Sequence, residues 1–249
     1  MRKEKEVLGK ISVIIPSYNE ERHIEQCIKE LTNVLDKSEF SEYEIIVVDD
    51  GSNDQTYEIL SSKFSNTERI IITTYSPNQG KGFALKHGFK ISTGEIVSFL
   101  DADMDLHPSH VISLYNYMTK HDYDLIIGSK RHPESVLVYP PLRRLYSNIY
   151  YYLIRLLFGL PIKDTQTGVK VFKREVLDFI FPKLLVKKYA FDLELLVVAH
   201  MGKYKIGEAP IVLEFKDKFK YNIGLKDIYR IILDTLGIYY RRYLRKTYS

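Results

Sequence analysis

Short apolar runs that alternate with helix-period segments constrain this chain more than any other feature. The runs cover residues 11–15, 45–48, 70–74, 95–100 and 125–128. They are rich in Ile and Val and have the length of buried strands. Between them, apolar residues recur at helical spacing. Apolar strands separated by helices predict an α/β fold, with a mostly parallel central sheet and helices on both faces.

Polar clusters follow three of these runs, and we expect Pro16 to end the first strand. Residues 16–20 are Pro-Ser-Tyr-Asn-Glu, residues 49–52 are Asp-Asp-Gly-Ser, and residues 101–105 are Asp-Ala-Asp-Met-Asp. The carboxyl ends of parallel strands share one edge of a sheet, where open α/β sheets bind their ligands. We therefore expect the three clusters to form one site.

The cluster at residues 101–105 carries three carboxylates. Carboxylates this close repel one another unless a cation lies between them, and oxygen ligands favour Mg²⁺ or Mn²⁺. The alternative is a polar loop that caps a helix starting near Pro108. The shared sheet edge favours a metal on Asp101 and Asp103, with Asp105 as a third ligand, directly or through water.

The pair Asp49-Asp50 suits a nucleotide, because a carboxylate at a strand end accepts hydrogen bonds from a base or a ribose. A turn made by Asp-Asp-Gly-Ser is the equal alternative, with Gly51 supplying a positive φ. The chain has neither the GxGxxG nor the GxxxxGK[ST] phosphate loop. A metal would then have to hold a diphosphate. Lys81, in a glycine-flanked turn, adds a phosphate contact or is simply solvated.

Composition narrows the class of protein. The length of 249 residues fits one large α/β domain or two small ones, and the single cysteine, Cys27, is expected in the core. A net charge of +4 does not indicate a nucleic-acid partner, and we expect none. No run reaches the roughly 18–20 apolar residues of a membrane span. We expect a soluble or peripheral membrane protein.

Four motifs, at residues 13–20, 46–54, 78–82 and 101–103, resemble in order and spacing those of the inverting, metal-dependent glycosyltransferases of family 2, which have the GT-A fold. The resemblance implies a nucleotide-sugar donor, with its base and ribose near the first two motifs and its diphosphate on the metal. The predicted donor-binding residues are Pro16, Tyr18, Glu20, Asp49, Asp50, Lys81, Asp101, Ala102 and Asp103.

Later motifs, at residues 128–131, 164–172, 190–196 and 206–211, resemble the dolichyl-phosphate mannose and dolichyl-phosphate glucose synthases. This implies transfer of a hexose from GDP-mannose or UDP-glucose to a polyprenyl or dolichyl phosphate. The Phe-Asp-x-Glu form at residues 191–194 leans towards glucose. The family commonly has Gly-Ser-Arg where this chain has Gly-Ser-Lys130-Arg131, so either cation is a candidate for the acceptor phosphate.

Two segments suit a membrane surface. Residues 141–159 form a predicted amphipathic helix with Arg143 and Arg144 at its start, and residues 216–249 form a second, ending in a basic cluster. A core-facing or a solvated helix is the alternative. Residues 216–220 are either a mobile loop over the donor or a solvated hairpin. We expect peripheral attachment at the cytoplasmic face, with residues 1–215 as the catalytic domain (10–130 for donor and metal, 131–215 for the acceptor).

We assign the acceptor phosphate to Arg131, Arg143 and Ser147, with Thr167 and Gly168 lining the same site. The predicted catalytic residues are Asp103, Arg131 and Arg143. A family 2 enzyme that acts on a saccharide or protein hydroxyl is the alternative, and it would need Asp192 or Glu194 as a general base. A non-catalytic membrane-surface scaffold is disfavoured, because a scaffold has no use for converging carboxylates.

Overall fold

The computed structural model describes residues 8–138, 141–188, 190–214 and 225–248, without the side chains of residues 138, 141–147 and 225–228. The predicted loop at residues 216–220 lies outside the described residues. The strands are β1 (Leu8–Ser17), β2 (Phe40–Asp49), β3 (Ile70–Thr74), β4 (Ile96–Phe99), β5 (Leu125–Gly128), β6 (Val136–Val138), β7 (Lys170–Lys173), β8 (Ile206–Ala209) and β9 (Val212–Glu214). The α-helices are α1 (Ile24–Asp36), α2 (Thr56–Phe64), α3 (Lys81–Ile91), α4 (His110–Lys120), α5 (Pro141–Phe158), α6 (Arg174–Ile180), α7 (Phe191–Met201) and α8 (Leu225–Tyr239).

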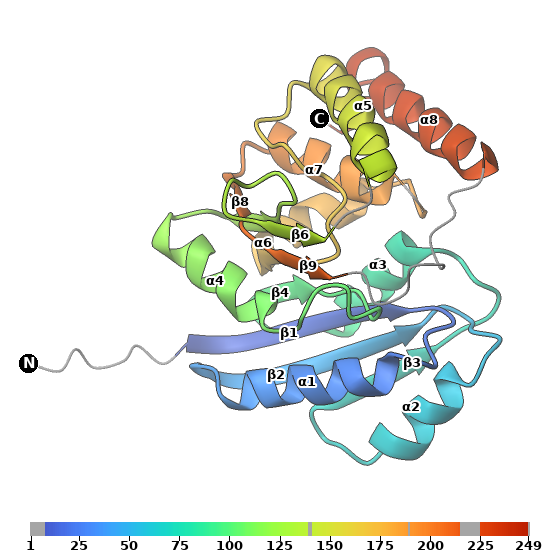
Figure 1. The fold of residues 1–249 in the computed structure, drawn as a ribbon, viewed down its shortest axis with the longest axis vertical. Coiled ribbons are helices and arrows are strands. Elements are labelled where there is room, and N and C mark those ends of the chain that lie inside the picture. The colour runs from blue at the N-terminus through green and yellow to red at the C-terminus, as the bar shows by residue number, and fades with distance from the viewer. Residues whose placement is uncertain (1–7, 139–140, 189, 215–224, 249) are drawn as a thin grey trace, which may run out of the picture.

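The central sheet has the strand order β3-β2-β1-β4-β7-β5-β8 (Figure 1). Its pairs are parallel except at β7, which runs antiparallel to both β4 and β5. The predicted mostly parallel sheet is confirmed. The antiparallel β7 brings the segment before it, residues 164–169, to the edge where β4 ends.

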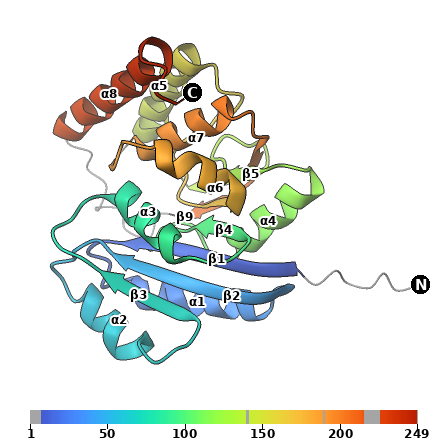
Figure 2. The ribbon, with the colours of Figure 1, turned by 180° about the vertical axis from the view of Figure 1, so that it is seen from behind.

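Each face of the sheet has its own hydrophobic core. Side chains alternate along the strands, so Ile14 faces one core while Val13 and Ile15 face the other. Helices α1, α2 and α4 cover the face that carries Val13 and Ile15, and Cys27 is buried there as predicted. Helices α3, α5, α6 and α7 cover the opposite face, which carries Ile14. The two views in Figures 1 and 2 show this layered arrangement from opposite sides.

The expected end of the first strand at Pro16 is wrong by one residue. β1 continues to Ser17, and Pro16 pairs in register with Val48. β4 pairs with β1 only as far as Ile14, so Pro16 lies where β1 has lost one neighbour and its missing N–H breaks no ladder on that side.

Helices α5 and α8 lie side by side at the end of the molecule opposite α1 and α2 (Figures 1 and 2). The C-terminal segment is packed onto the rest of the chain, since Ile238 and Tyr248 are buried in the same core as side chains of α7. No helix within the described residues is both long enough and apolar enough to cross a membrane.

Candidate active site

The carboxyl ends of β2, β1 and β4 are neighbours in the sheet, which confirms the expected common edge. Asp50 N–H donates to the Ser17 carbonyl at 2.8 Å and so ties the first two ends together. The Oγ of Ser17 is buried at this edge and has no hydrogen-bond partner among the described residues. A buried orphan hydroxyl at a strand end is suited to a polar ligand.

Asp49 is buried, and its carboxylate organises the turn that follows β2. It accepts hydrogen bonds from the Ser52 N–H at 3.2 Å, from the Ser52 hydroxyl, and from the Thr74 hydroxyl at 2.8 Å. Gly51 has φ +71°, and a Cβ there would lie 2.9 Å from the Tyr75 carbonyl oxygen. The turn interpretation of Asp-Asp-Gly-Ser therefore holds. Oδ2 of Asp49, which accepts one hydrogen bond among the described residues, retains a lone pair for a ligand.

Asp50 holds the turn that leads into α3. Its carboxylate accepts hydrogen bonds from the Asn78 side-chain amide at 2.8 Å, from Gln79 N–H at 2.7 Å and from Gly80 N–H at 2.8 Å. These three bonds fix the backbone immediately before Lys81. The structure thus gives Asp50 a positioning role that sequence reasoning missed, because its partners lie 28 to 30 residues away.

The loops after β1 and β2 form one wall. Asn19 N–H donates to the Ser52 hydroxyl at 2.9 Å, and Asn53 N–H donates to the Asn19 side-chain oxygen at 2.8 Å. Tyr18 is exposed beside them, where its ring is open to a ligand. Glu20 Oε2 lies 3.4 Å from His23 Nδ1, at the start of the turn before α1.

Asp101 forms an ion pair with Lys81, whose Nζ lies 2.5 Å from its Oδ1. Burial and the charge of Asp103 raise the pKa of Asp101 above its ordinary value, against the charge of Lys81. Burial alone would lower the pKa of Lys81, but the charges of Asp101 and Asp192 hold it above its ordinary value. Asp103 Oδ1 accepts a hydrogen bond from Asp105 N–H at 3.1 Å, and Ala102 is buried between the two acids.

The two carboxylates of Asp101 and Asp103 fit a hard divalent cation. Burial, and after it the charge of Asp103, raises the pKa of Asp101, and a bound cation would stabilise the ionised carboxylate. Within the part of the chain that the structure describes, no group of three His, Cys, Asp or Glu side chains is arranged to hold a metal. Mg²⁺ and Mn²⁺ are commonly held by one or two carboxylates together with substrate phosphates, so two suffice. A role for Asp105 stays a prediction.

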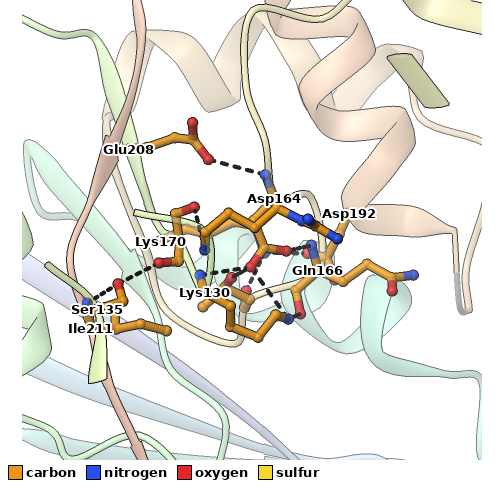
Figure 3. Close-up of polar contacts among 11 residues, drawn as sticks. Lys130, Ser135, Asp164, Gln166, Lys170, Asp192, Glu208 and Ile211 are labelled. Atoms are coloured by element: carbon orange, nitrogen blue, oxygen red, sulfur yellow. Dashed lines mark hydrogen bonds and ion pairs between the residues drawn. The ribbon is translucent and has the colours of Figure 1, made fainter. Parts of the chain in front are cut away.

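A second ion pair, between Lys170 and Asp192, lies close enough to the Lys81–Asp101 pair for their charges to interact. Lys170, on β7, is 1% exposed, and its Nζ lies 2.7 Å from Asp192 Oδ1 at the start of α7 (Figure 3). The same Nζ donates to the Thr167 carbonyl. Burial alone would raise the pKa of Asp192, but the charges of Lys170 and Lys81 lower it. Sequence reasoning missed Lys170, although a lysine inside the apolar strand Val-Lys-Val-Phe signals a buried partner.

Asp164 is the centre of a network between the two halves of the site (Figure 3). Its carboxylate accepts hydrogen bonds from Lys130 N–H at 2.9 Å, from Gln166 N–H at 3.1 Å and from the Thr167 hydroxyl at 2.9 Å. Burial alone would raise the pKa of Asp164, but the Lys130 charge and these hydrogen bonds lower it. The loop then reaches Gly168, whose added Cβ would lie 2.3 Å from Asp101 Oδ2.

A small cationic cavity of about 30 Å³ opens beside this network. The cations that line it are Lys130, Arg131, Arg155 and Lys163. The Tyr151 ring orders two of the arginines: the Arg131 guanidinium lies 4.6 Å from its centroid, and Arg155 Nη1 donates to its hydroxyl at 2.9 Å. The predicted Arg131 therefore lines this small cationic cavity. Arg143 and Ser147 belong to α5, but their side chains lie outside the described residues, so their roles stay predictions.

The chain resembles known proteins over most of its length. Residues 12–181 match the family model Glycosyl transferase family 2. The dolichyl-phosphate beta-glucosyltransferase of Homo sapiens is 33% identical over 215 residues, which cover 81% of this chain and 66% of that protein. The protein of the same name from Saccharomyces cerevisiae is 32% identical over 237 residues, 88% and 71% of the two chains.

Solved structures agree with the fold. Glucosyl-3-phosphoglycerate synthase from Mycobacterium tuberculosis, crystallised with Mn²⁺, UDP-glucose and phosphoglyceric acid, superposes with a TM-score of 0.67 at 20% identity. The superposition covers 94% of this chain and 79% of that one. This similarity confirms the predicted GT-A fold.

Proposed function

Because this chain belongs to glycosyl transferase family 2, we propose that it transfers glucose from UDP-glucose to a dolichyl-type polyprenyl phosphate, with inversion. One observation carries the proposal. The loop 164–168 joins a cationic cavity at Asp164 to the carboxylate pair at Asp101, so a phosphate acceptor and a diphosphate donor would meet across it. Its relatives named as dolichyl-phosphate beta-glucosyltransferases support glucose over mannose.

The donor half supplies binding and charge. We assign the base and ribose to the exposed Tyr18 and to Oδ2 of Asp49, while Asp50 holds the turn that carries Lys81. Lys81 is the cation nearest to Asp101 and is suited to a departing phosphate. A divalent cation, when held by Asp101 and Asp103, would supply further positive charge for the leaving diphosphate. Mn²⁺, present in the solved glucosyl-3-phosphoglycerate synthase complex, is the cation we favour.

The acceptor half orients an anion. A lipid phosphate has a second pKa near ~6, so at neutral pH it is already a nucleophile and needs no general base. Arg131 and Arg155, stacked on and bonded to Tyr151, offer charge-assisted hydrogen bonds to its oxygens. Arg143 and Ser147 complete the predicted set.

A membrane surface would present such an acceptor. The outer face of α5 exposes Ile149, Tyr152 and Leu156, the last of which is 84% exposed, and α8 exposes a comparable apolar stripe beside it. Tyrosines and cations at the edge of such a face are typical of interfacial helices. We therefore propose peripheral attachment through α5 and α8, with the site facing the bilayer.

A hydroxyl acceptor is less well supported by the site. It needs a general base, and both predicted candidates have other partners. Asp192 is paired with Lys170 and its pKa is lowered, which weakens it as a base. Glu194 is fully buried and accepts four hydrogen bonds, from two backbone N–H groups, Arg241 and Tyr248.

The decisive experiment is a donor panel with the purified chain. Detergent-solubilised dolichyl phosphate is offered with UDP-glucose or GDP-mannose, and with Mn²⁺, Mg²⁺ or EDTA, and the glycosylated lipid is measured by mass spectrometry. We expect glucosyl transfer that requires a divalent cation and is abolished by Asp103→Asn. Asp122→Asn, on an exposed loop, is the matched control. Full activity of Asp103→Asn, or in EDTA, would overturn the proposal, and transfer of mannose alone would overturn the choice of sugar.

A further inference from the structure

A cavity of about 300 Å³ lies between the segment that precedes α7 and the adjoining face of α8. None of the residues to which we assign the donor, the metal or the acceptor phosphate lines it. The cavity is therefore separate from the small cationic cavity at Arg131, and it is about ten times larger.

The polar lining of this cavity is mainly cationic. Lys187, Lys188, Arg230 and Arg241 contribute positive charge, and Asp234 is the acidic lining residue. Arg241 forms an ion pair with Glu194, with 2.9 Å between Nη2 and Oε1. The Nζ of Lys187 lies 5.5 Å from the centroid of the Phe83 ring. The side chains of Lys188 and Arg230 form no ion pair with any other described residue. Cations that line a concave surface without an acidic partner attract an anion. The guanidinium of arginine is well suited to bind phosphate oxygens.

Apolar side chains line the cavity together with these cations. Leu185 and Leu233 line the cavity and are 58% and 48% exposed. Ile232 and Leu236 of α8 are also exposed apolar residues. Figure 2 shows α8 beside α5. A soluble anion would use the cations only, whereas an amphiphile would use the apolar rim as well. Cations beside exposed apolar side chains therefore favour a phosphate that carries an apolar tail.

We propose that this cavity binds the phosphate headgroup of an acidic bilayer phospholipid, with its acyl chains along Leu185 and Leu233. The acceptor's own phosphate is a poorer occupant, because it must reach the donor sugar near Asp101 and Asp103, and neither residue lines the cavity. The proposal rests on the proposed function only in placing the chain at a membrane. The headgroup site would fix the orientation in which α8 meets the bilayer.

The test measures binding of the whole chain to vesicles in sedimentation assays, with no nucleotide sugar present. Phosphatidylcholine vesicles are compared with the same vesicles containing phosphatidylglycerol. Lys188→Ala/Arg230→Ala removes two cavity cations, and Lys120→Ala/Lys203→Ala removes two exposed cations elsewhere as the charge-matched control. We expect the wild type and the control to bind phosphatidylglycerol vesicles, and the cavity variant to bind them roughly tenfold more weakly.

Three further arms identify the occupant. Leu233→Ser should weaken vesicle binding, since it removes the apolar rim but leaves the charge. Inorganic phosphate should not displace the vesicles; if it does, the cavity is a soluble-anion site. Phosphatidylcholine vesicles that contain polyprenyl phosphate should bind the wild type and the cavity variant equally. If the cavity variant loses only that binding, the cavity serves the acceptor and the proposal is wrong.

Equal weakening in the cavity variant and in the charge-matched control would also overturn the proposal, because it would indicate a general charge effect. The urea-unfolding midpoint of the cavity variant should match that of the wild type, which would show that the variant is folded. Because vesicle binding is measured without donor or transfer, its outcome is independent of whether the proposed glucosyl transfer is correct.

Discussion

Lys170 and Asp192 form a buried ion pair, 2.7 Å between Nζ and Oδ1, that joins the strand β7 to the start of α7. Lys170 is almost fully inaccessible to water, so each charge depends on the other for its compensation. The pair lies next to Lys81 and Asp101, whose charges also act on Asp192 and Lys170. Opposite charges thus alternate through the centre of the proposed site.

Asp192→Asn is expected to lower the free energy of unfolding by about 3–5 kcal/mol, because it leaves the buried charge of Lys170 without its carboxylate partner. Transfer by the remaining folded enzyme should fall less than ~10²-fold, since a phosphate acceptor needs no base. Urea denaturation and kcat measured on the same samples separate the two effects. The double variant Lys170→Met/Asp192→Leu should recover stability. A larger loss of kcat in folded Asp192→Asn would instead support a general base and a hydroxyl acceptor.

Gly168→Ala is expected to displace Asp101, because the new Cβ would lie 2.3 Å from Oδ2 and 2.7 Å from the carboxyl carbon. We expect Mn²⁺ affinity in the presence of UDP to fall ~10–100-fold, the range seen when groups that orient a metal ligand are disturbed. Calorimetry measures this directly. Gly237→Ala on α8 is the control, since the atom nearest to its Cβ would be Arg241 Nη1, at 3.2 Å. Unchanged metal affinity in Gly168→Ala would exclude Asp101 as a ligand.

Asp164 should make stability depend on pH. Its pKa is lowered in the folded state, so its ionised form stabilises the protein at neutral pH, and that contribution is lost as the pH falls through the folded-state pKa. Asp164→Asn should destabilise the protein by ~1–3 kcal/mol at pH 7 and flatten the acid side of the stability profile. Denaturation at a series of pH values measures both. The exposed Glu68→Gln serves as the control, and parallel profiles for Asp164→Asn and the wild type would contradict this prediction.

Tyr248→Phe is expected to loosen the C-terminal segment. Its hydroxyl donates to Glu194 over 2.5 Å, and the same carboxylate accepts the backbone N–H groups of Leu185 and Val186. Loss of one hydrogen bond to a buried charge should cost about 1.5–3 kcal/mol. Hydrogen exchange should show faster exchange in α8 and at residues 185–186. Tyr243→Phe, at an exposed position, should show neither change, and equal exchange in both variants would refute the role of Tyr248.

The local pattern was enough to predict most strands and the common edge of the site. Apolar runs report burial, and polar residues at the end of a run report where a parallel strand leaves the sheet. For this reason the sequence predicted that Asp49, Asp101 and Asp103 belong to one site, and in the structure they lie at one edge of the sheet. Cys27 was placed in the core on the same grounds.

Pairing between distant residues could not be read from the pattern. The insertion of antiparallel β7 between β4 and β5 depends on backbone hydrogen bonds that periodicity does not specify. The role of Asp50 in holding the turn before Lys81 depends on partners at residues 78–80. Glu194 appeared as a candidate base, but it is taken up by Arg241 and Tyr248, 47 and 54 residues away.

The sequence alone determined the fold class and which edge of the sheet carries the chemistry, because side-chain period and strand-end composition are local properties. Only the tertiary structure decided which charged groups are available to bind a metal or a substrate and which are used in buried structural ion pairs. Asp192 is paired with the buried Lys170 from another element, whereas Asp101 is paired with the partly exposed Lys81 and also lies within reach of the negative charge of Asp103. That difference arises from packing, because the free energy of a buried charge depends on the neighbours that the fold brings to it.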